Sequence, residues 1–352
     1  MNPFFSICIP NYNYAHYLKE TIESVLCQDF DDFEIIIIDN CSTDNSWEII
    51  QSFSDPRIKK YRNNYNIGFA PNLQVAISKA RGKFINLLSA DDKMKHGALK
   101  KYFEVINQEI DKTNLFLLSD VAYIDNSSIE YGAEERNLIS FQSCRCSLTD
   151  YKGSGEVLSF SGLEILRKVL PQLKNPAPFL SVVVSSSLLN SVEGFNAIRT
   201  IGPDKFFNYK LLFQDPRVLY IRVIGFQYRI HSSVNMVAQA TNIKQQIDDY
   251  LNTIEFSDLQ FEKLGIKKKV VIDGFINRVC LESGFYFLVH GNTNQAIRCL
   301  GFSLASYPNE SLKKIKWFFL LFLIIFSSFG KIILKFARFF RYKINKINKI
   351  NR

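Results

Sequence analysis

Residues 34–39 read Glu-Ile-Ile-Ile-Ile-Asp, four isoleucines in a row that end on a carboxylate. A short, uniformly apolar run of this kind is typical of a strand that is buried on both faces of a parallel sheet. A second apolar run occupies residues 5–10, and residues 15–27 between the two runs carry apolar side chains at helical spacing. This order predicts an open, mostly parallel α/β sheet flanked by helices.

The alternation continues to residue 92. We expect a helix that carries Trp47 and Ile50, a strand over 59–61, a helix opened by Pro71 and stopped by Gly82, and a strand over 84–88. Residues 121–178 show little periodicity. Beyond them the sequence predicts a strand over 179–184, two strands within 217–231, and helices over 244–307 with a break at 290–292.

Polar side chains stand where three of these strands end, namely Asn11, Asp39 and Asp91. Ligands of open α/β sheets bind beyond the carboxyl ends of the strands, so a site is expected there. No glycine-rich GxGxxG or GxxxxGKS/T loop occurs, which excludes the usual phosphate-cradling loops. Asp91 and Asp92 are adjacent carboxylates, which suit Mn²⁺ or Mg²⁺ completed by substrate phosphates and water. The alternative for such a pair is a solvated turn.

Several motifs follow one another in a fixed order. They are PNYN at 10–13, IIIIDNCSTD at 35–44, NIGFAPN at 66–72, SADD at 89–92, SSSLLNSVEGF at 185–195 and YRIHSS at 228–233. Together they resemble glycosyltransferase family 2, which has the GT-A fold. The resemblance covers roughly residues 4–235.

The resemblance implies roles for individual residues. The positions that match the donor nucleotide site are Pro10, Asn11, Tyr12, Asp39, Asn66, Asn72 and Asp91. Asp92 matches the metal-binding carboxylate, although Ser89 stands where an acid is commoner. His231 is a second metal candidate, with a structural histidine as the equal alternative. Arg229 is a candidate for stabilising the departing diphosphate.

Asp204 is the candidate catalytic base, because the family places an acidic pair some ten residues after its Gly-Phe turn. Here that turn is Gly194–Phe195, and Pro203 stands where one of the two acids is usual. A carboxylate in this place can remove the proton of an acceptor hydroxyl. The competing interpretation is an acidic residue that complements the dipole at a helix N-terminus.

The resemblance therefore implies an inverting, metal-dependent hexosyl transfer from a nucleotide-diphospho-sugar to a saccharide hydroxyl, in cell-surface polysaccharide biosynthesis. A different class of function stays open, because Ser89 and Pro203 are also compatible with a degenerate site. In that case the chain is a non-catalytic binding or scaffold protein at a membrane.

The formal net charge of +9 is unevenly distributed. Residues 313–352 contain eleven Lys and Arg and no acid, so the remaining 312 residues carry a net charge of −2. A near-neutral body argues against a nucleic-acid partner, whereas a basic tail favours an anionic membrane surface. Seven cysteines, an odd number, and the lack of a visible secretory signal favour the cytoplasmic face of the membrane.

The tail begins with fourteen uncharged, mostly apolar residues at 317–330. As a helix they span about 21 Å, short of a hydrocarbon core of roughly 30 Å, so a peripheral or shallowly inserted helix is favoured over a span. Basic and apolar residues then separate onto two sides of a helix over 331–341. A buried core helix with a solvated end is the alternative. The expected division is a transferase domain over 1–240, a helical region over 241–312 and a membrane-associating tail over 313–352.

Overall fold

The computed structural model describes residues 2–134, 147–151, 155–195, 203–231, 250–251 and 256–326. The chain divides into two compact units. The N-terminal unit comprises Met1–Val169 with Lys174–Ser232, and the C-terminal unit comprises Leu170–Leu173 with Ser233–Arg352. The division of the tail from the helical region at residue 313 stays a prediction.

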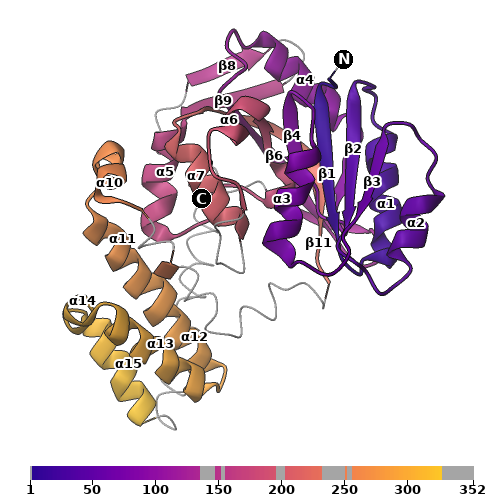
Figure 1. The fold of residues 1–352 in the computed structure, drawn as a ribbon. Helices are drawn as coiled ribbons and strands as arrows, with labels where there is room; N and C mark the ends of the chain where they lie inside the picture. The colour runs from indigo at the N-terminus through magenta and orange to yellow at the C-terminus, as the bar shows by residue number, and fades with distance from the viewer. Residues whose placement is uncertain are drawn as a thin grey trace. The chain divides into compact units, whose positions relative to one another are not determined.

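The N-terminal unit is an open α/β sheet with helices on both faces, as the sequence predicts (Figure 1). Its strands are β1 Phe5–Asn11, β2 Phe33–Asp39, β3 Ile58–Arg62, β4 Phe84–Leu87, β5 Lys93–Met94, β6 Leu115–Ile124, β7 Glu130–Glu134, β8 Ser147–Tyr151, β9 Gly155–Ser161, β10 Val183–Ser185 and β11 Arg217–Arg229. Its α-helices are α1 Ala15–Leu26, α2 Ser46–Ser52, α3 Phe69–Lys79, α4 Ala98–Gln108, α5 Gly162–Val169, α6 Ser186–Asn190 and α7 Pro203–Phe213.

The strand order is β3-β2-β1-β4-β10-β6-β11-β9-β8, with β5 paired to β11 and β7 to β6. Strands β3, β2, β1 and β4 are mutually parallel, and β6 is parallel to β11, whereas β10, β9, β8, β7 and β5 pair in the antiparallel sense. The sheet is thus mixed, and its parallel character is concentrated in the first half. The register aligns Asn11 with Asp39 and Asp39 with Arg62, so these three polar residues lie side by side at the carboxyl ends of β1, β2 and β3.

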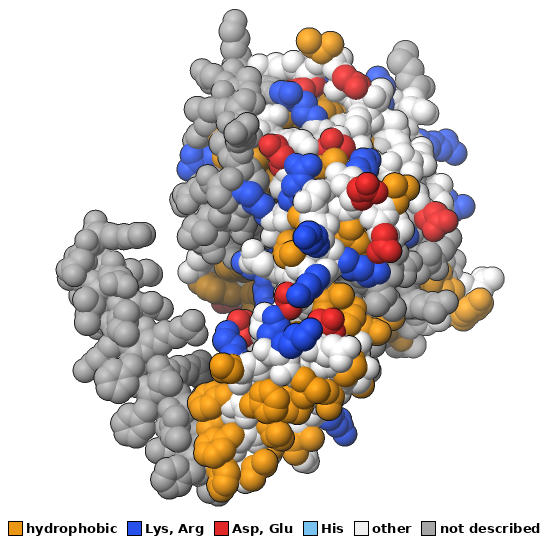
Figure 2. Space-filling model, turned by 90° about the vertical axis from the view of Figure 1, so that its left-hand side faces the viewer, with side chains coloured by type: hydrophobic (Ala, Val, Ile, Leu, Met, Phe, Trp, Pro, Cys, Tyr) orange, Lys and Arg blue, Asp and Glu red, His pale blue; other side chains and the backbone are white. Residues whose placement is uncertain are grey.

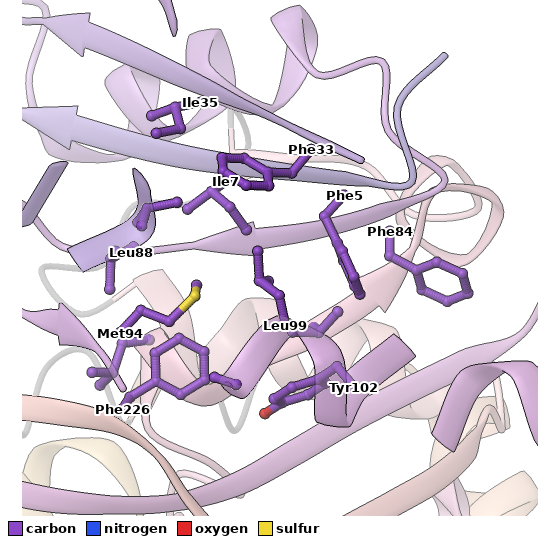
Figure 3. Packing of buried hydrophobic residues seen from close by; sticks show 14 of the residues in the cluster. Phe5, Ile7, Phe33, Ile35, Phe84, Leu88, Met94, Leu99, Tyr102 and Phe226 are labelled. Carbon is purple, nitrogen blue, oxygen red and sulfur yellow. The ribbon is translucent and has the colours of Figure 1, made fainter. Parts of the chain in front are cut away.

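The main hydrophobic core lies between the sheet and helices α1, α2 and α4. Phe5 and Ile7 of β1 contribute one side of it, and Leu99 and Tyr102 of α4 contribute the other, as Figure 3 shows. All four side chains have at most 1% of their surface exposed. Helices α3, α6 and α7 contribute side chains to a small apolar cavity on the opposite side, together with β4 and β10. The sheet is therefore buried on both sides, which explains its continuous apolar strands.

Several local predictions differ from the structure. Helix α3 begins at Phe69 after Gly68, so Pro71 is its third residue. Residues 179–184 form a 3-10 turn, Phe179–Ser181, before the short β10. The two strands expected within 217–231 are one strand, β11, with register shifts between Ile221 and Phe226 against β6.

Gly82 does not end α3, which stops at Lys79. Its N–H donates to Ser6 Oγ at 2.7 Å, and a Cβ at this position would lie 2.5 Å from the backbone nitrogen of Ser6. Glycine is required here because the chain passes directly against β1.

The C-terminal unit is helical. It contains α10 Asp258–Leu264, α11 Lys268–Gly274, the π-helix η5 Phe275–Glu282, α12 Ser283–Val289, α13 Thr293–Ser306, α14 Pro308–Leu312 and α15 Ile315–Ile325. The predicted break at 290–292 is confirmed: α12 and α13 form a hairpin, and Gly291 has a positive φ of 82° at its turn.

Helix α15 packs into this unit through one face only. Trp317 Nε1 donates to Ser303 Oγ at 3.2 Å, and Leu320 and Leu323 are fully buried. The other face exposes Phe318 and Phe322, and Figure 2 shows hydrophobic side chains gathered over these C-terminal helices. The start of the apolar run is thus a partly buried helix of the C-terminal unit.

Within the described part of the chain, no helix is both long and apolar enough to cross a bilayer. The amphipathic helix predicted over 331–341 lies outside the described residues and stays a prediction.

Candidate active site

Asn11 and Asp39 form the first polar pair of the site, at the carboxyl ends of β1 and β2. Asn11 Nδ2 donates to Asp39 Oδ1 at 2.9 Å and to Ser42 Oγ at 3.1 Å. Both residues are buried, and Asn11 Oδ1 is a buried acceptor without a hydrogen-bond partner in the described residues. Of the neighbouring predicted residues, Pro10 is buried in β1, whereas Tyr12 is 41% exposed.

Asp39 is held by further residues that the sequence alone did not reveal. Arg62 Nε lies 3.2 Å from Asp39 Oδ2, and Ser42 donates to the carboxylate through both Oγ and its backbone N–H. Arg62 also donates to Ser42 O and lies over the ring of Trp47. The buried carboxylate is thus compensated by a cation and fixed in orientation, which lets it position Asn11.

The predicted residues Asn66 and Asn72 belong to a network of asparagines beside this pair. Asn40 Nδ2 donates to Asn66 Oδ1 at 2.8 Å, and Asn63 Nδ2 donates to Asn40 Oδ1 and Asn72 Oδ1, both at 2.9 Å. Asn72 is buried, and Gly68 N–H also donates to Asn66 Oδ1. These bonds join the loops after β2 and β3 to the start of α3, so they fix the wall of the site.

Asp92 is 1% exposed, and its Oδ1 accepts a hydrogen bond from the backbone N–H of Arg229 at 2.8 Å. Burial, and then the neighbouring charge of Asp91, raise the pKa of Asp92 well above its usual value. Thr21 of α1 donates to the backbone oxygens of Ala90 and Asp92 and anchors the loop. A cation near the two carboxylates would relieve the repulsion that raises this pKa.

His231 lies beside Asp91, with Nε2 3.0 Å from Asp91 Oδ2. Its ring contacts Tyr17 at a centroid distance of 5.2 Å. The described residues contain no group of three or more His, Cys, Asp or Glu side chains placed to hold a metal ion. Asp91 and Asp92 are adjacent carboxylates, which fit a divalent cation of the kind that takes one or two carboxylates and completes its shell with substrate phosphates and water.

Arg229 is fully buried, and its guanidinium binds acceptors of the protein itself. Nε donates to Asp91 O at 2.7 Å, Nη1 donates to Asp125 O at 2.8 Å, and Nη2 donates to Glu20 Oε2 at 3.1 Å. The guanidinium also lies over the ring of Tyr17, 4.4 Å from its centroid. Through these bonds Arg229 connects α1, the end of β6 and the loop that carries Asp91. Because its donors bind acceptors of the protein, this placement does not favour the predicted contact with a diphosphate.

Asp204 lies in the first turn of α7, so both sequence-based interpretations of this residue stay compatible with its position. Its Oδ2 accepts a hydrogen bond from Asn175 Nδ2 at 2.6 Å, and Asn208 Nδ2 in turn donates to Asn175 Oδ1 at 3.1 Å. Asp204 and Asn208 also line the small cavity of about 20 Å³, whose other walls are mostly apolar side chains such as Ile85 and Phe207.

Burial, and then the charges of Asp92, Asp91 and Asp204, raise the pKa of the Tyr228 hydroxyl. Burial and the same two adjacent aspartates raise the pKa of Tyr14 to about 12. Tyr228 was missed by the sequence reasoning, although it begins the YRIHSS motif.

Comparisons with known proteins agree with this geometry. Residues 6–119 match the profile described as Glycosyl transferase family 2. The chain is 36% identical over 104 residues to the putative teichuronic acid biosynthesis glycosyltransferase TuaG of Bacillus subtilis (strain 168), covering 29% of this chain and 41% of TuaG. It is 41% identical over 87 residues to WfaP of Escherichia coli, covering 25% of this chain and 35% of WfaP. WfaP is described as a UDP-Glc:alpha-D-GlcNAc-diphosphoundecaprenol beta-1,3-glucosyltransferase. The matched segments thus span less than half the length of these relatives.

The fold is similar to that of S. aureus TarS (residues 1–349), with a TM-score of 0.58, 16% identity, and coverage of 95% of this chain and 89% of that chain. At this identity the likeness concerns the fold alone. It agrees with the GT-A architecture expected from the ordered motifs. Asn11, Asp39, Asp91 and Asp92 all lie inside the segment, residues 6–119, that matches the glycosyl transferase family 2 profile.

Proposed function

We propose that the chain transfers a hexosyl group from a nucleotide-diphospho-sugar to a hydroxyl group of a saccharide acceptor, with inversion and with Mn²⁺ or Mg²⁺. One observation carries the proposal: Asp92 is buried and its Oδ1 accepts the backbone N–H of Arg229 at 2.8 Å, beside Asp91, whose Oδ2 lies 3.0 Å from His231 Nε2. Two adjacent carboxylates suit the cation and diphosphate side of such a reaction, and Asp204 is the candidate for its acceptor side.

In this proposal Asp204 is the general base. It accepts the proton of the acceptor hydroxyl while the acceptor oxygen bonds to the anomeric carbon and the bond from that carbon to the diphosphate breaks. A single displacement of this kind inverts the anomeric centre. Asn175 holds one carboxylate oxygen of Asp204, and Asn208 holds Asn175, so the base is oriented by two amides.

On the donor side, Asn11 and Asp39 are proposed to hold the nucleoside, and Asp92 with Asp91 is proposed to hold the cation. When bound, the cation supplies positive charge for the departing diphosphate. His231 hydrogen-bonds Asp91 and orients that carboxylate, which we favour over direct binding of the metal by His231.

The acceptor is proposed to be lipid-linked, as in the description of WfaP, and the reaction to belong to cell-surface polysaccharide biosynthesis. We propose a peripheral or monotopic position at the cytoplasmic membrane face, and the C-terminal unit supports the association with a membrane. Helix α15 exposes an apolar face, and residues 327–352 beyond it contain eight Lys and Arg and no acid. Apolar insertion combined with basic charge is the combination that binds anionic bilayers.

The alternative is a catalytically degenerate binding or scaffold protein at the membrane, suggested by Ser89 and Pro203. Release of nucleoside diphosphate from a panel of nucleotide sugars, with and without Mn²⁺, separates the two functions. If the chain is a transferase, at least one donor should be turned over in a metal-stimulated reaction. Asp92→Ala should abolish this turnover. Asp111→Ala, which removes an exposed carboxylate that is not part of the candidate site, should retain it. No turnover with any donor would favour the scaffold.

A further inference from the structure

Helix α1 and the turn that follows it carry three buried polar side chains on the side that packs against residues 90–99. They are Thr21, Ser24 and Gln28, spaced three and four residues apart, and none is more than 7% exposed. We call these three residues the α1 polar row. A polar group in a buried place costs free energy unless it is hydrogen-bonded, so each member of the row needs a partner.

Ser24 and Gln28 bind a segment that also belongs to the sheet. Ser24 Oγ accepts the backbone N–H of Met94 at 3.1 Å, and Gln28 Nε2 donates to Lys95 O at 2.9 Å. Met94 lies in β5, which pairs with β11, and the N–H of Lys95 donates to Gly225 O. Two independent sets of bonds therefore hold this segment, so the loss of Ser24 leaves the other set in place.

Thr21 binds the turn between β4 and β5, which carries the aspartate pair. Its Oγ1 lies 2.9 Å from Ala90 O and 2.8 Å from Asp92 O, and the single proton of the hydroxyl is shared between these two acceptors. The carbonyl between them, that of Asp91, accepts a hydrogen bond from Arg229 Nε at 2.7 Å. Three consecutive carbonyl groups of this turn thus accept hydrogen bonds from side chains.

The two bonds of Thr21 lie on either side of the aspartate pair. The Ala90 carbonyl belongs to the peptide group before Asp91, and the Asp92 carbonyl belongs to the peptide group after Asp92. Because peptide groups are planar, fixing these two leaves the backbone of both aspartates little freedom to rotate. The directions in which the two side chains leave the backbone are therefore set by Thr21 together with Arg229.

We propose that Thr21 is a positioning residue of the cation site, whose hydroxyl keeps the two aspartates in the relative placement on which cation binding depends. This proposal rests on the proposed function, because it concerns the cation of that reaction. Residues that orient metal ligands from outside the coordination shell change metal affinity about 10- to 100-fold when they are replaced. Ser24, in the same row, fixes the segment after the aspartates and has no such role.

The test measures the binding of Mn²⁺ alone to the full-length protein, by electron paramagnetic resonance of the free ion. Thr21→Val keeps the shape of the side chain and removes its hydroxyl, so Mn²⁺ should bind about tenfold more weakly. Thr21→Ser restores the hydroxyl and should stay within about twofold of wild type. The matched control is Ser24→Ala, which removes a hydroxyl of the same row and should also stay within about twofold.

The melting temperature of each metal-free variant separates positioning from a loss of fold. Thr21→Val and Ser24→Ala each remove buried hydrogen bonds, so both should melt a few degrees below wild type, yet only Thr21→Val should lose Mn²⁺ affinity. If Thr21→Val does not fold, Thr21→Cys takes its place. Its thiol is a weak donor, and the expected loss of Mn²⁺ affinity is about fivefold.

Three results would overturn the role of Thr21: a wild-type protein that binds no Mn²⁺, a folded Thr21→Val or Thr21→Cys variant that binds Mn²⁺ as wild type does, or an equal weakening by Ser24→Ala. Hydrolysis of the donor, measured on the same variants with Mn²⁺, keeps the two proposals apart. If Thr21→Val alone loses Mn²⁺ affinity but the wild-type protein turns over no donor, the positioning role stands and the transferase function fails.

Discussion

Asp92 Oδ1 accepts the backbone N–H of Arg229 at 2.8 Å, a hydrogen bond between residues 137 positions apart. It ties the loop after β4 to the end of β11. The side chain of Arg229 reinforces the same connection by donating to Asp91 O. The Asp92 carboxylate and the backbone of Asp91 are therefore held in place by Arg229 at the end of β11.

Replacing Asp92 by Asn keeps this hydrogen bond and removes the charge. We expect Asp92→Asn to lower metal-stimulated donor turnover by at least about 100-fold, the scale of losing one preorganised electrostatic contact. The metal-free protein should melt no earlier than wild type, because burial already raises the pKa of Asp92 and makes its charge costly. Turnover within threefold of wild type would contradict the assignment. Asp92→Ala, which also loses the bond to Arg229, should cost about 1–3 kcal/mol of stability in addition.

Glu20 gives a pH-dependent prediction. Burial acts to raise its pKa, but the hydrogen bond from Ser128 and the charges of Lys93 and Arg229 outweigh burial and lower it below 4.5. A lowered folded-state pKa means that the stabilisation is present above pH 4.5 and is lost as pH falls through the folded-state pKa. Glu20→Gln should therefore lose about 1 kcal/mol at neutral pH, a modest value because Glu20 is 44% exposed. In urea unfolding this difference should narrow from about pH 5 toward pH 3.

The matched control for Glu20 is Glu23→Gln, which breaks an exposed helical ion pair with Lys19. Its effect should stay below about 0.5 kcal/mol at every pH. A Glu20→Gln penalty that is independent of pH would show that the interaction with Arg229 is not electrostatic.

The first half of the sheet could be predicted because β1, β2 and β4 are almost fully buried and a helix lies between each pair of consecutive strands from β1 to β4. Strand β11 could not, because Gly225 interrupts the apolar run as a turn would. In the structure Gly225 lets the strand pass against Ser119, where a Cβ would lie 2.5 Å from Ser119 Oγ, and a bulge results. Glycine is common in β-bulges as well as in turns, so the presence of Gly225 in the sequence does not distinguish the two.

The strand predicted over 179–184 begins only at Val183, for a different reason. The carbonyl oxygens of the residues before it bind distant side chains: Asn86 Nδ2 donates to Leu180 O and Val182 O, and the Tyr102 hydroxyl donates to Ser181 O. These hydrogen bonds satisfy the carbonyl groups of residues 180–182, so these residues need no pairing with a neighbouring strand. The positions of Asn11, Asp39 and Asp91 follow from strand ends, whereas the hydrogen bond from Asn175 to Asp204 is a tertiary contact that hydrophobic periodicity does not reveal.

Asp204→Asn should abolish sugar transfer and leave donor binding unchanged, because the amide cannot accept the acceptor proton. The measurement is a transfer assay with α-GlcNAc-diphosphoundecaprenol as acceptor, paired with calorimetric titration of the donor. Asn175→Ala removes the amide that donates to Asp204 and accepts from Asn208 but leaves the Asp204 carboxylate, so kcat should fall about tenfold with little change in the acceptor KM. A near-normal rate for Asp204→Asn would leave the residue as a helix N-terminal charge.

The exposed face of α15 predicts a membrane phenotype. Its side chains recur at helical spacing: Ile315, Phe318, Phe319, Phe322 and Ile325 are 46–86% exposed. The double variant Phe318→Ser, Phe322→Ser should bind phosphatidylglycerol-containing vesicles at least about tenfold more weakly in flotation, since each lost insertion removes apolar burial. Leu259→Ser, the same kind of change at a 74% exposed position of α10, is the control.

Truncation after residue 326 separates the contribution of basic charge to membrane binding from the contribution of apolar insertion. It leaves the buried residues Trp317, Leu320 and Leu323 in place, which a truncation at 313 would remove. The shortened chain should retain part of its vesicle binding and lose its preference for anionic over zwitterionic lipid. Unchanged flotation of both the shortened chain and the double variant would exclude this end of the protein as the membrane anchor.

Gly82 offers a test of the fold at the first strand. A Cβ there would lie 2.5 Å from Ser6 N and 2.7 Å from Phe5 C, both backbone atoms of a buried central strand that cannot move aside. Gly82→Ala should therefore cost about 2–3 kcal/mol in urea unfolding, the scale of overpacking a close-packed interior. Gly301→Ala is the contrasting case, because nothing lies within 4 Å of its Cβ position in α13, and helix propensity predicts a gain of up to about 1 kcal/mol. If Gly82→Ala were as stable as wild type, β1 could not lie where the register with β2 and β4 places it, and the alignment of Asn11 with Asp39 would lose its support.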